Sequence, residues 1–330
     1  MWGTSTVIEV INAGLETTIQ DYPGRVGYWN IGIPPSGPLD DRSFRLANLL
    51  VGNDAGAAGL EIQLVGPTLR FGRDASFALT GADVRPKLDG VPTPMWQTVA
   101  VRAGQVLKIA TARTGLRAYL CVNGGIATEP VLGSRSTFVR AGIGGIDGGA
   151  LVAGQHLPLG PPTSVSPHAV SRDRVPDFSG TVKLEVLAGP HDDWLDEDGR
   201  NALLHGEWTV QAQSDRTGYR LAGPQLSFSP KAYDKTPENG VDPSNVINTG
   251  YPIGGVNICG GTPIILPVDG PSEGGFINPF TVASGALWKL GQARPGSSLR
   301  FALVSLSDAL QLRQEGDRFA SEGTLERVSQ

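Results

Sequence analysis

The sequence predicts a mainly β protein built from many short strands, and three observations lead to that prediction. The 330 residues include 45 glycines and 25 prolines, together roughly a fifth of the chain where about an eighth is usual. Apolar residues make up 40% of the chain, in runs of strand length, which argues against disorder. Between residues 61 and 160 such runs alternate with glycine turns. Because glycine and proline supply tight turns, we expect an all-β barrel or sandwich architecture.

The elements follow in order along the chain. A first strand is expected over 7–11, and a helix after Asp40 and Asp41, which stand where an N-cap should be, with Gly52 ending it. A short acidic helix is expected from Asp192, and a terminal helix from about residue 307, followed by a solvated tail. The apolar runs expected to form further strands cover residues 60–66, 68–72, 76–82, 105–110, 117–125 and 183–189.

The domain boundaries follow from a shift in composition. The stretch from 161 to 180 is rich in Pro, Ser and charge and has no periodic apolar face, so we expect it to be a linker. Residues 1–160 are then expected to form a first β-barrel domain and 181–306 a second. We expect residues 307–330 to form a C-terminal helix and tail.

Two short matches between the halves favour a duplicated barrel. The run LVGPTLRF around Pro67 resembles LAGPQLSF around Pro224, and RAGQVLKI around Gly104 resembles RPGSSLRF around Gly296. The matches occur in the same order, so we expect each pair to occupy equivalent positions in the two barrels.

Charge and hydropathy exclude several classes. The net charge is −5 without a basic block, so nucleic acid is not an expected partner. No apolar stretch is long enough to span a membrane, and the N-terminus does not read as a secretory signal, so we expect a cytoplasmic protein. Cys121 and Cys259 are expected to be reduced, buried thiols; a disulfide or a reactive thiol is the alternative.

Several catalytic signatures are missing. The chain has no G-x-x-x-x-G-K-[ST], so we expect no P-loop contact with ATP here. It lacks H-E-x-x-H, C-x-x-C and G-x-S-x-G, so neither a metal site nor a serine nucleophile is expected. No lysine stands in a Met-Lys-Met setting, so any biotin must be carried by another chain or domain.

The loop before the first helix is the first candidate site. It carries Arg25, and its Ser36-Gly37 pair lies just before the helix start at Asp40. A helix start offers N–H groups to an anion, which makes Arg25 and Asp40 catalytic candidates and Ser36 and Gly37 substrate-binding ones. Alternatively Arg25 pairs with Asp21, and Asp40 is only a cap.

The second candidate is the glycine-rich run STFVRAGIGGIDGGAL. Its glycines let backbone amides approach an anion closely, so Arg140, Gly142, Gly144 and Gly145 are candidate substrate-binding residues. A tight barrel corner would use the same glycines.

Two further candidate loops lie in the second half. His191 precedes a capped helix and could be an acid or base, although a lone histidine often only donates or accepts a structural hydrogen bond. Asp269 and Glu273 flank a Gly-Pro turn, with Asn257 upstream. Paired carboxylates can do acid–base chemistry, so Asp269 is a catalytic candidate and Asn257 a substrate-binding one; an exposed turn would explain the carboxylates equally well.

Longer runs are more specific than these loops taken singly: TTIQDYPGRVGYWNIGIPPSGPLDD, GLEIQLVGPTLRF, STFVRAGIGG, SDRTGYRLAGPQL, DPSNVINTGYPIGGVN and PVDGPSEGGF. In this order, over about residues 8–304, they resemble the family called allophanate hydrolase subunit 2, or carboxyltransferase subdomains A and B. They look most like the carboxyltransferase half of urea carboxylase and urea amidolyase. The C component of the ATP-dependent 5-oxoprolinase is similar too.

The resemblance implies two cyclophilin-like β-barrel domains with a few short helices. It implies a subunit of a biotin-dependent carboxyltransferase that acts on an amide-like substrate with an allophanate hydrolase subunit 1-like partner, and possible companions are a biotin carboxylase and a biotin carrier. ATP is then used in the partner complex. The alternatives are the C component of 5-oxoprolinase, working with a third subunit, and a non-catalytic regulator that antagonises a subunit 1-like kinase inhibitor. The chain departs from the family pattern at Gly148-Gly149, where Gly-Arg is frequent, and at Asp242, where urea carboxylases tend to have histidine.

Overall fold

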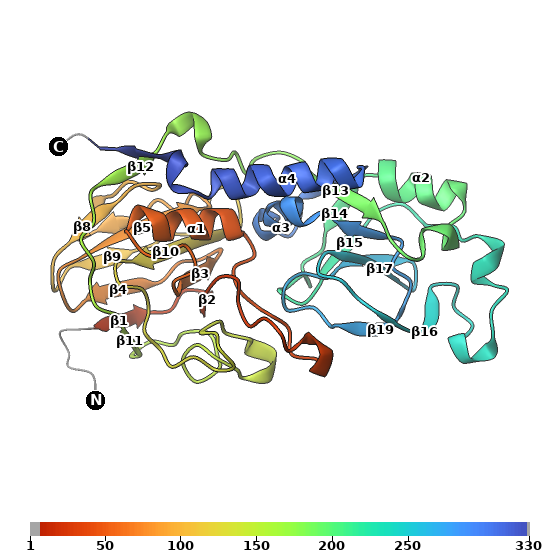
Figure 1. The fold of residues 1–330 in the computed structure, drawn as a ribbon, viewed down its shortest axis with the longest axis horizontal. Coiled ribbons are helices and arrows are strands. Elements are labelled where there is room, and N and C mark those ends of the chain that lie inside the picture. The colour runs from red at the N-terminus through yellow and green to blue at the C-terminus, as the bar shows by residue number, and fades with distance from the viewer. Residues whose placement is uncertain (1–6, 329–330) are drawn as a thin grey trace. The chain divides into compact units, whose positions relative to one another are not determined.

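The computed structural model describes residues 7–328, which divide into two compact units (Figure 1). The first unit comprises the chain up to Val26, residues 36–179 and the chain from Asp317 onward. The second unit comprises residues 27–35 and 180–316. Strands dominate both units, which confirms the mainly β fold class.

Two antiparallel sheets form the first unit, as the alternation of apolar runs and glycine turns predicts. Their inner faces share one apolar core, which includes Ile8, Leu69, Phe77 and Leu120. One sheet has the strand order β11 (His156–Pro158), β1 (Val7–Asn12), β4 (Thr68–Phe71), β9 (Val106–Lys108), β6 (Lys87–Leu88), β7 (Val91–Pro92). The other has the order β2 (Glu16–Gln20), β3 (Gly59–Gln63), β10 (Arg117–Val122), β5 (Ala75–Gly81), β8 (Val99–Val101).

Helix α1 (Asp41–Leu50) lies across β5 and β10 (Figure 1). Asp40 caps it by accepting a hydrogen bond from the Ser43 amide at 3.0 Å, which confirms the predicted helix start. Phe44 on the buried face meets Tyr119 of β10 edge-to-face at 5.9 Å between ring centroids. The helix thereby covers the outer face of the five-stranded sheet, and it fixes the end of the loop that leads to Asp40.

The segment expected to be a linker is part of the first unit, whose boundary falls at Ser179 instead. It contains β12 (His168–Val170) and the 3-10 turn η4 (Arg172–Arg174). The tail of the chain, expected to be solvated, contains η9 (Glu322–Thr324) and β22 (Leu325–Arg327), and β22 pairs with β12. The backbone hydrogen bonds of both segments are therefore satisfied in a short sheet, which composition alone did not reveal.

The second unit is a closed barrel. Its strand order is β13 (Val182–Ala188), β20 (Phe280–Val282), β17 (Gly255–Cys259), β18 (Thr262–Ile265), β15 (Tyr219–Ala222), β14 (Trp208–Val210), β21 (Ser298–Leu303). A parallel pairing of β13 with β21 closes it. Trp208, Tyr219 and Phe280 fill the interior, and closure leaves no unpaired strand edge in the barrel.

Helices and a separate hairpin-like sheet accompany the barrel. The helices are α2 (Glu197–His205), α3 (Leu287–Gln292) and α4 (Leu306–Phe319), whose last residues belong to the first unit. The short helix expected from Asp192 is a 3-10 turn, η5 (Asp192–Trp194), and α2 follows with Asp196 as its own N-cap. Strands β16 (Asn245–Gly250) and β19 (Glu273–Phe276) pair outside the barrel.

One of the two sequence matches marks equivalent turns. The Gly104 amide donates to Phe71 O at 2.7 Å, and the Gly296 amide donates to Val210 O at 2.8 Å. The two φ angles are 85° and 86°, so both turns feed a strand in the same way. At the other match, Pro67 lies between β3 and β4, and Pro224 follows β15 and precedes Phe228, which forms an isolated bridge with Leu195. The expected equivalence of Pro67 and Pro224 stays a prediction.

Both cysteines are free, and burial raises the pKa of the thiols of Cys121 and Cys259. Within residues 7–328 no helix combines the length and the hydropathy that a membrane crossing requires.

Candidate functional site

Arg25 and Asp21 hold the start of the glycine-rich run in the first unit. The Arg25 side chain is 1% exposed; its Nε donates to Val131 O at 3.0 Å and its Nη2 to Ser136 O at 2.7 Å. Asp21 accepts hydrogen bonds from the hydroxyls of Ser134 and Ser136 at 2.5 and 2.6 Å. The structure therefore joins the first two loops that the sequence singled out separately.

Two glycines of the second loop are required by this close packing. A Cβ on Gly144 would lie 2.0 Å from Ser136 O and 2.8 Å from Arg25 Nη2, and one on Gly145 would lie 2.2 Å from Thr137 Oγ1. Both glycines also have positive φ, where a side chain is strained. Glycine at these two positions allows the backbone of residues 144–145 to pack against residues 136–137 and the side chain of Arg25.

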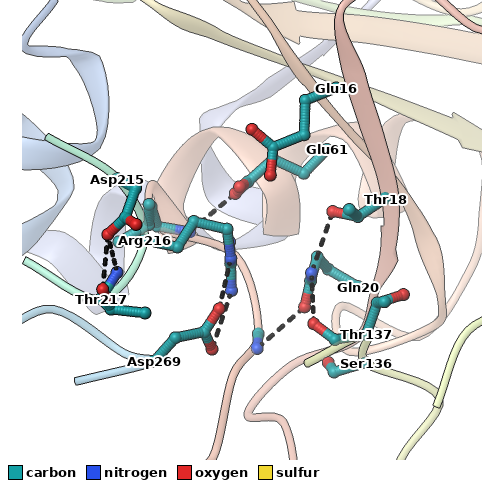
Figure 2. Close-up of polar contacts among 12 residues, drawn as sticks. Glu16, Thr18, Gln20, Glu61, Ser136, Thr137, Asp215, Arg216, Thr217 and Asp269 are labelled. Atoms are coloured by element: carbon teal, nitrogen blue, oxygen red, sulfur yellow. Dashed lines mark hydrogen bonds and ion pairs between the residues drawn. The ribbon is translucent and has the colours of Figure 1, made fainter. Parts of the chain in front are cut away.

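Ser36 and Gly37 lie at the other end of the first loop, and both have positive φ, which is disfavoured only for Ser36. Ser36 has φ 58° and Gly37 has φ 86°. The Gly37 amide donates to Gln20 Oε1 at 3.0 Å, while Gln20 Nε2 donates to Thr18 Oγ1 and to Thr137 O (Figure 2). Ser36 is 2% exposed, and its hydroxyl has no hydrogen-bond partner among the described residues. A non-glycine residue held at positive φ with an unpaired buried hydroxyl is a feature typical of binding sites.

A buried polar layer fixes the chain after Gly37. Glu61 Oε2 accepts from the Leu39 amide at 2.9 Å and from the Tyr119 hydroxyl at 3.0 Å, and Glu61 Oε1 accepts from Arg117 Nε at 3.2 Å. The Tyr119 hydroxyl in turn accepts from the Asp40 amide at 2.8 Å. Burial, and then the charges of Glu61 and Asp40, raise the pKa of Tyr119, so its hydroxyl keeps the proton it donates. The sequence analysis does not predict this layer; its signal is a glutamate and an arginine, Glu61 and Arg117, within apolar strand runs.

The remaining first-unit candidates have local roles. Asp40 is fully buried and also accepts from the Ser43 hydroxyl at 2.6 Å, so the cap uses both carboxylate oxygens. Arg140 is exposed on the 3-10 turn η3 (Val139–Ala141), which Gly142 ends with φ 65°. Binding roles for Asp40, Arg140 and Gly142 stay predictions.

In the second unit, Asp269 is half of a buried ion pair (Figure 2). Arg216 Nε donates to Asp269 Oδ2 at 2.7 Å, and the two side chains are 7% and 4% exposed. Glu273, expected beside it as a second carboxylate, is exposed at the start of β19. Because the pair is so well buried, it fixes the position of the turn that carries Asp269, and this structural role is independent of any catalytic role of the carboxylate.

His191 and Asn257 lie in the second unit as well. The His191 Nδ1 accepts from the Asn278 amide at 3.1 Å. Burial, aided by the charge of Lys231 and opposed by that of Asp193, lowers the pKa of His191, which suits a neutral ring with an accepting Nδ1. Asn257, on β17, is 3% exposed, and its Oδ1 has no partner among the described residues.

A cavity of about 650 Å³ opens in the second unit. Two aromatic rings, Trp29 of η2 (Trp29–Ile31) and Tyr251, line it together with the polar side chains of Asn30, Ser272 and Glu273. Sequence reasoning selected the loops that carry these residues, but of the residues themselves it named only Glu273. Aromatic rings beside a few polar groups are typical of small-molecule pockets.

Comparisons with known proteins identify the family to which this architecture belongs. Residues 31–303 match the family model described as carboxyltransferase domain, subdomain A and B. The crystal structure of the Kluyveromyces lactis urea carboxylase superimposes with a TM-score of 0.92 and 37% identity, covering 98% of this chain and 30% of that one. The chain therefore belongs to the carboxyltransferase subdomain A and B family.

Two curated relatives show the range of the family. The urea amidolyase of Saccharomyces cerevisiae is 38% identical over 94% of this chain. The C component of the Escherichia coli 5-oxoprolinase is 35% identical over 95% of this chain and 96% of its own length. This chain spans only 17% to 26% of the fungal relatives it matches.

Proposed function

We propose that this chain is the carboxyltransferase component of an enzyme of the urea carboxylase type, which carboxylates a nitrogen of an amide-like substrate. The observation that carries the proposal is the match to the Kluyveromyces lactis urea carboxylase, with a TM-score of 0.92 over 98% of this chain. A similarity over 98% of the chain spans both units, which supports the same role for this chain.

Biotin carried by another chain or domain is the cofactor that this function requires. When bound as its carboxylated form it supplies an activated carboxyl group. The orphaned hydroxyl of Ser36 fits such a group, because it is a single buried hydrogen-bonding atom with no partner within the described residues. Ser36 would hold one oxygen of the carboxyl group, and the buried Arg25 keeps the glycine-rich run in place and adds a positive charge to its surroundings.

The other candidate residues divide between positioning and binding. Gln20 binds the Gly37 amide and thereby sets the position of Ser36. The Arg216–Asp269 pair fixes the turn after β18 in the second unit. Hydrogen bonds to a fixed framework of this kind stabilise developing charge without reorganisation during the reaction.

A partner similar to allophanate hydrolase subunit 1 completes the proposal, together with a biotin carboxylase and a biotin carrier that use ATP. The test is reconstitution of this chain with these partners, followed by measurement of ADP release with urea and bicarbonate. We expect turnover that needs bicarbonate and this chain. Turnover of the same rate without this chain would refute the proposal.

The 5-oxoprolinase role is the second candidate, because the C component of the Escherichia coli enzyme matches this chain over 96% of its own length. In that role the chain works with two further subunits to open a cyclic amide with ATP. ADP release with 5-oxoproline in the absence of bicarbonate would favour this candidate over the first.

A further inference from the structure

The first unit contains a cavity of about 390 Å³ that shares no lining residue with the candidate loops. Its lining comes from residues 81–86, from residues 93–96, from Thr114 and from residues 175–178. Cavities that bind small molecules have volumes of about 300–1,000 Å³. The cavity is therefore large enough for a small molecule, and it is formed by parts of the chain to which no role has yet been assigned.

Apolar side chains form one wall of this cavity. Met95, Trp96 and Phe178 line it. Trp96 belongs to the apolar core that also contains Phe44 of α1, and Met95 and Phe178 pack against that core. Because the same side chains contact a packed core on one side and the cavity on the other, they offer a fixed apolar surface to a ligand.

Two residues of the lining have backbone conformations that are unfavourable for any residue except glycine. Trp96 has a φ of 60° and Arg85 has a φ of 41°, and positive φ is a genuine outlier for a bulky residue such as tryptophan. Hydrogen bonds hold Trp96 there, because its amide donates to Leu79 O and its carbonyl accepts from the Val170 amide, both at 2.8 Å. Such residues concentrate at ligand sites, where the surrounding structure maintains them.

The polar part of the lining carries one charge of each sign. Asp83 is half-buried and Arg85 is exposed, and both line the cavity. Within residues 7–328, neither the carboxylate of Asp83 nor the guanidinium of Arg85 has a hydrogen-bond or ion-pair partner. The backbone of Asp83 is fixed, since its amide donates to Thr114 O at 3.1 Å and its carbonyl accepts from the Arg113 amide at 2.8 Å. An acceptor and a donor of opposite charge therefore stand ready beside an apolar wall.

We propose that this cavity binds an α-amino acid with a large apolar side chain. The ammonium group of the ligand pairs with Asp83 and its carboxylate pairs with Arg85. Its side chain contacts Met95, Trp96 and Phe178. Both charges of the ligand then form charge-assisted hydrogen bonds, which are about twice as strong as neutral ones. The inference goes beyond the proposed function and does not depend on it.

Occupation of the cavity should also restrain the end of the first unit. Val175 and Phe178 line the cavity, and the first unit ends at Ser179. Both side chains are only partly buried against the core behind them, so a ligand adds contacts that the ligand-free protein lacks. Additional contacts of this kind raise the free energy of local opening, and amide hydrogen exchange of residues 175–178 should become slower.

The experiment measures binding of L-phenylalanine to the full chain by isothermal titration calorimetry. Three control ligands each lack one feature: phenylacetate has no ammonium group, phenethylamine has no carboxylate, and glycine has no apolar side chain. We expect L-phenylalanine to bind and each control to bind at least about tenfold more weakly, because each loses a charge-assisted hydrogen bond or the apolar contact.

Three variants test the residues. Asp83→Asn should weaken the binding of L-phenylalanine by about tenfold or more, whereas Asp54→Asn, the same change at an exposed aspartate of the first unit outside the cavity lining, should leave it unchanged. Arg85→Gly removes the guanidinium but relieves the φ of 41°. It should therefore weaken binding without lowering the melting temperature of the ligand-free protein. L-Phenylalanine should slow hydrogen exchange of residues 175–178 in the wild type but not in Asp83→Asn.

Three results would overturn the inference: no binding of L-phenylalanine at millimolar concentration, equal binding of any control ligand, or unchanged affinity in Asp83→Asn or Arg85→Gly. If Asp83→Asn does not fold, Arg85→Gly decides, because it removes a contact to the ligand and a source of strain together. These measurements need only this chain and no carboxylation, so their failure and the failure of the proposed function can be told apart.

Discussion

The Arg216–Asp269 pair allows the sharpest prediction about a candidate catalytic carboxylate. Its Nε–Oδ2 distance is 2.7 Å, and its side chains are 7% and 4% exposed. Asp269→Asn removes the negative charge and leaves the buried guanidinium of Arg216 facing a neutral amide. Breaking a buried pair in this way costs about 3–5 kcal/mol. At about 2–4 °C per kcal/mol for a unit of this size, the melting temperature should fall by roughly 6–20 °C.

The matched control is Glu207→Gln. Glu207 faces Arg300 at 3.5 Å with both side chains 57% exposed, so the same charge change should cost less than about 1 kcal/mol. Calorimetry on both variants, with steady-state kinetics of the reconstituted complex, is the assay. If Asp269→Asn melts within a degree of Glu207→Gln yet loses kcat, the carboxylate acts in the chemistry rather than in the fold, and the reasoning is refuted.

Three further predictions concern Ser36, His191 and the glycine-rich run. Ser36→Gly and Ser36→Ala both remove the hydroxyl, so both should lower kcat/KM. Only glycine is unstrained at the φ of 58°, so Ser36→Gly should be more stable than Ser36→Ala by about 1 kcal/mol. The opposite order of stability in chemical denaturation would contradict the strain argument. Burial lowers the pKa of His191 in the folded state, so the unfolded chain takes up the proton first as the pH falls through about 6.5. The melting temperature of the wild type should then fall between pH 7.5 and 5, and that of His191→Gln should fall less. Identical pH profiles of the two melting temperatures would contradict a lowered pKa of His191. Gly144→Ala places a Cβ 2.0 Å from a carbonyl oxygen, whereas the Cβ of Gly142→Ala, also at positive φ, meets nothing within 4 Å. In denaturant unfolding, Gly144→Ala should therefore lose about 1–3 kcal/mol more unfolding free energy than Gly142→Ala. Equal losses in the two variants would show that the positive φ alone accounts for the effect.

Local chemistry made much of the fold predictable from the sequence. The cap at Asp40 and the apolar face behind it fixed the start of α1, and the apolar runs between glycines became strands such as β5 and β10. The pairing of β12 with β22 was not predictable, since it joins residues about 160 apart in the chain through backbone groups that carry no sequence signal.

The candidate site was predictable as loops but not as geometry. Arg25 and the glycine-rich run were selected separately, and only the fold shows that Arg25 binds the carbonyls of Val131 and Ser136. Asp83 and Trp96 went unnoticed, because what distinguishes them is the cavity that they line together. A cavity is a property of three-dimensional packing, so a single sequence cannot display it.

The most direct test of the central claim is the transfer of radiolabelled carbon from bicarbonate to urea by the reconstituted complex. The account predicts that label enters the product only when ATP, the biotin-bearing partner and this chain are all present, and that Ser36→Ala lowers the rate without dissociating the complex. Label transfer at the full rate without this chain, or ATP-dependent opening of 5-oxoproline with no label incorporated from bicarbonate, would contradict it.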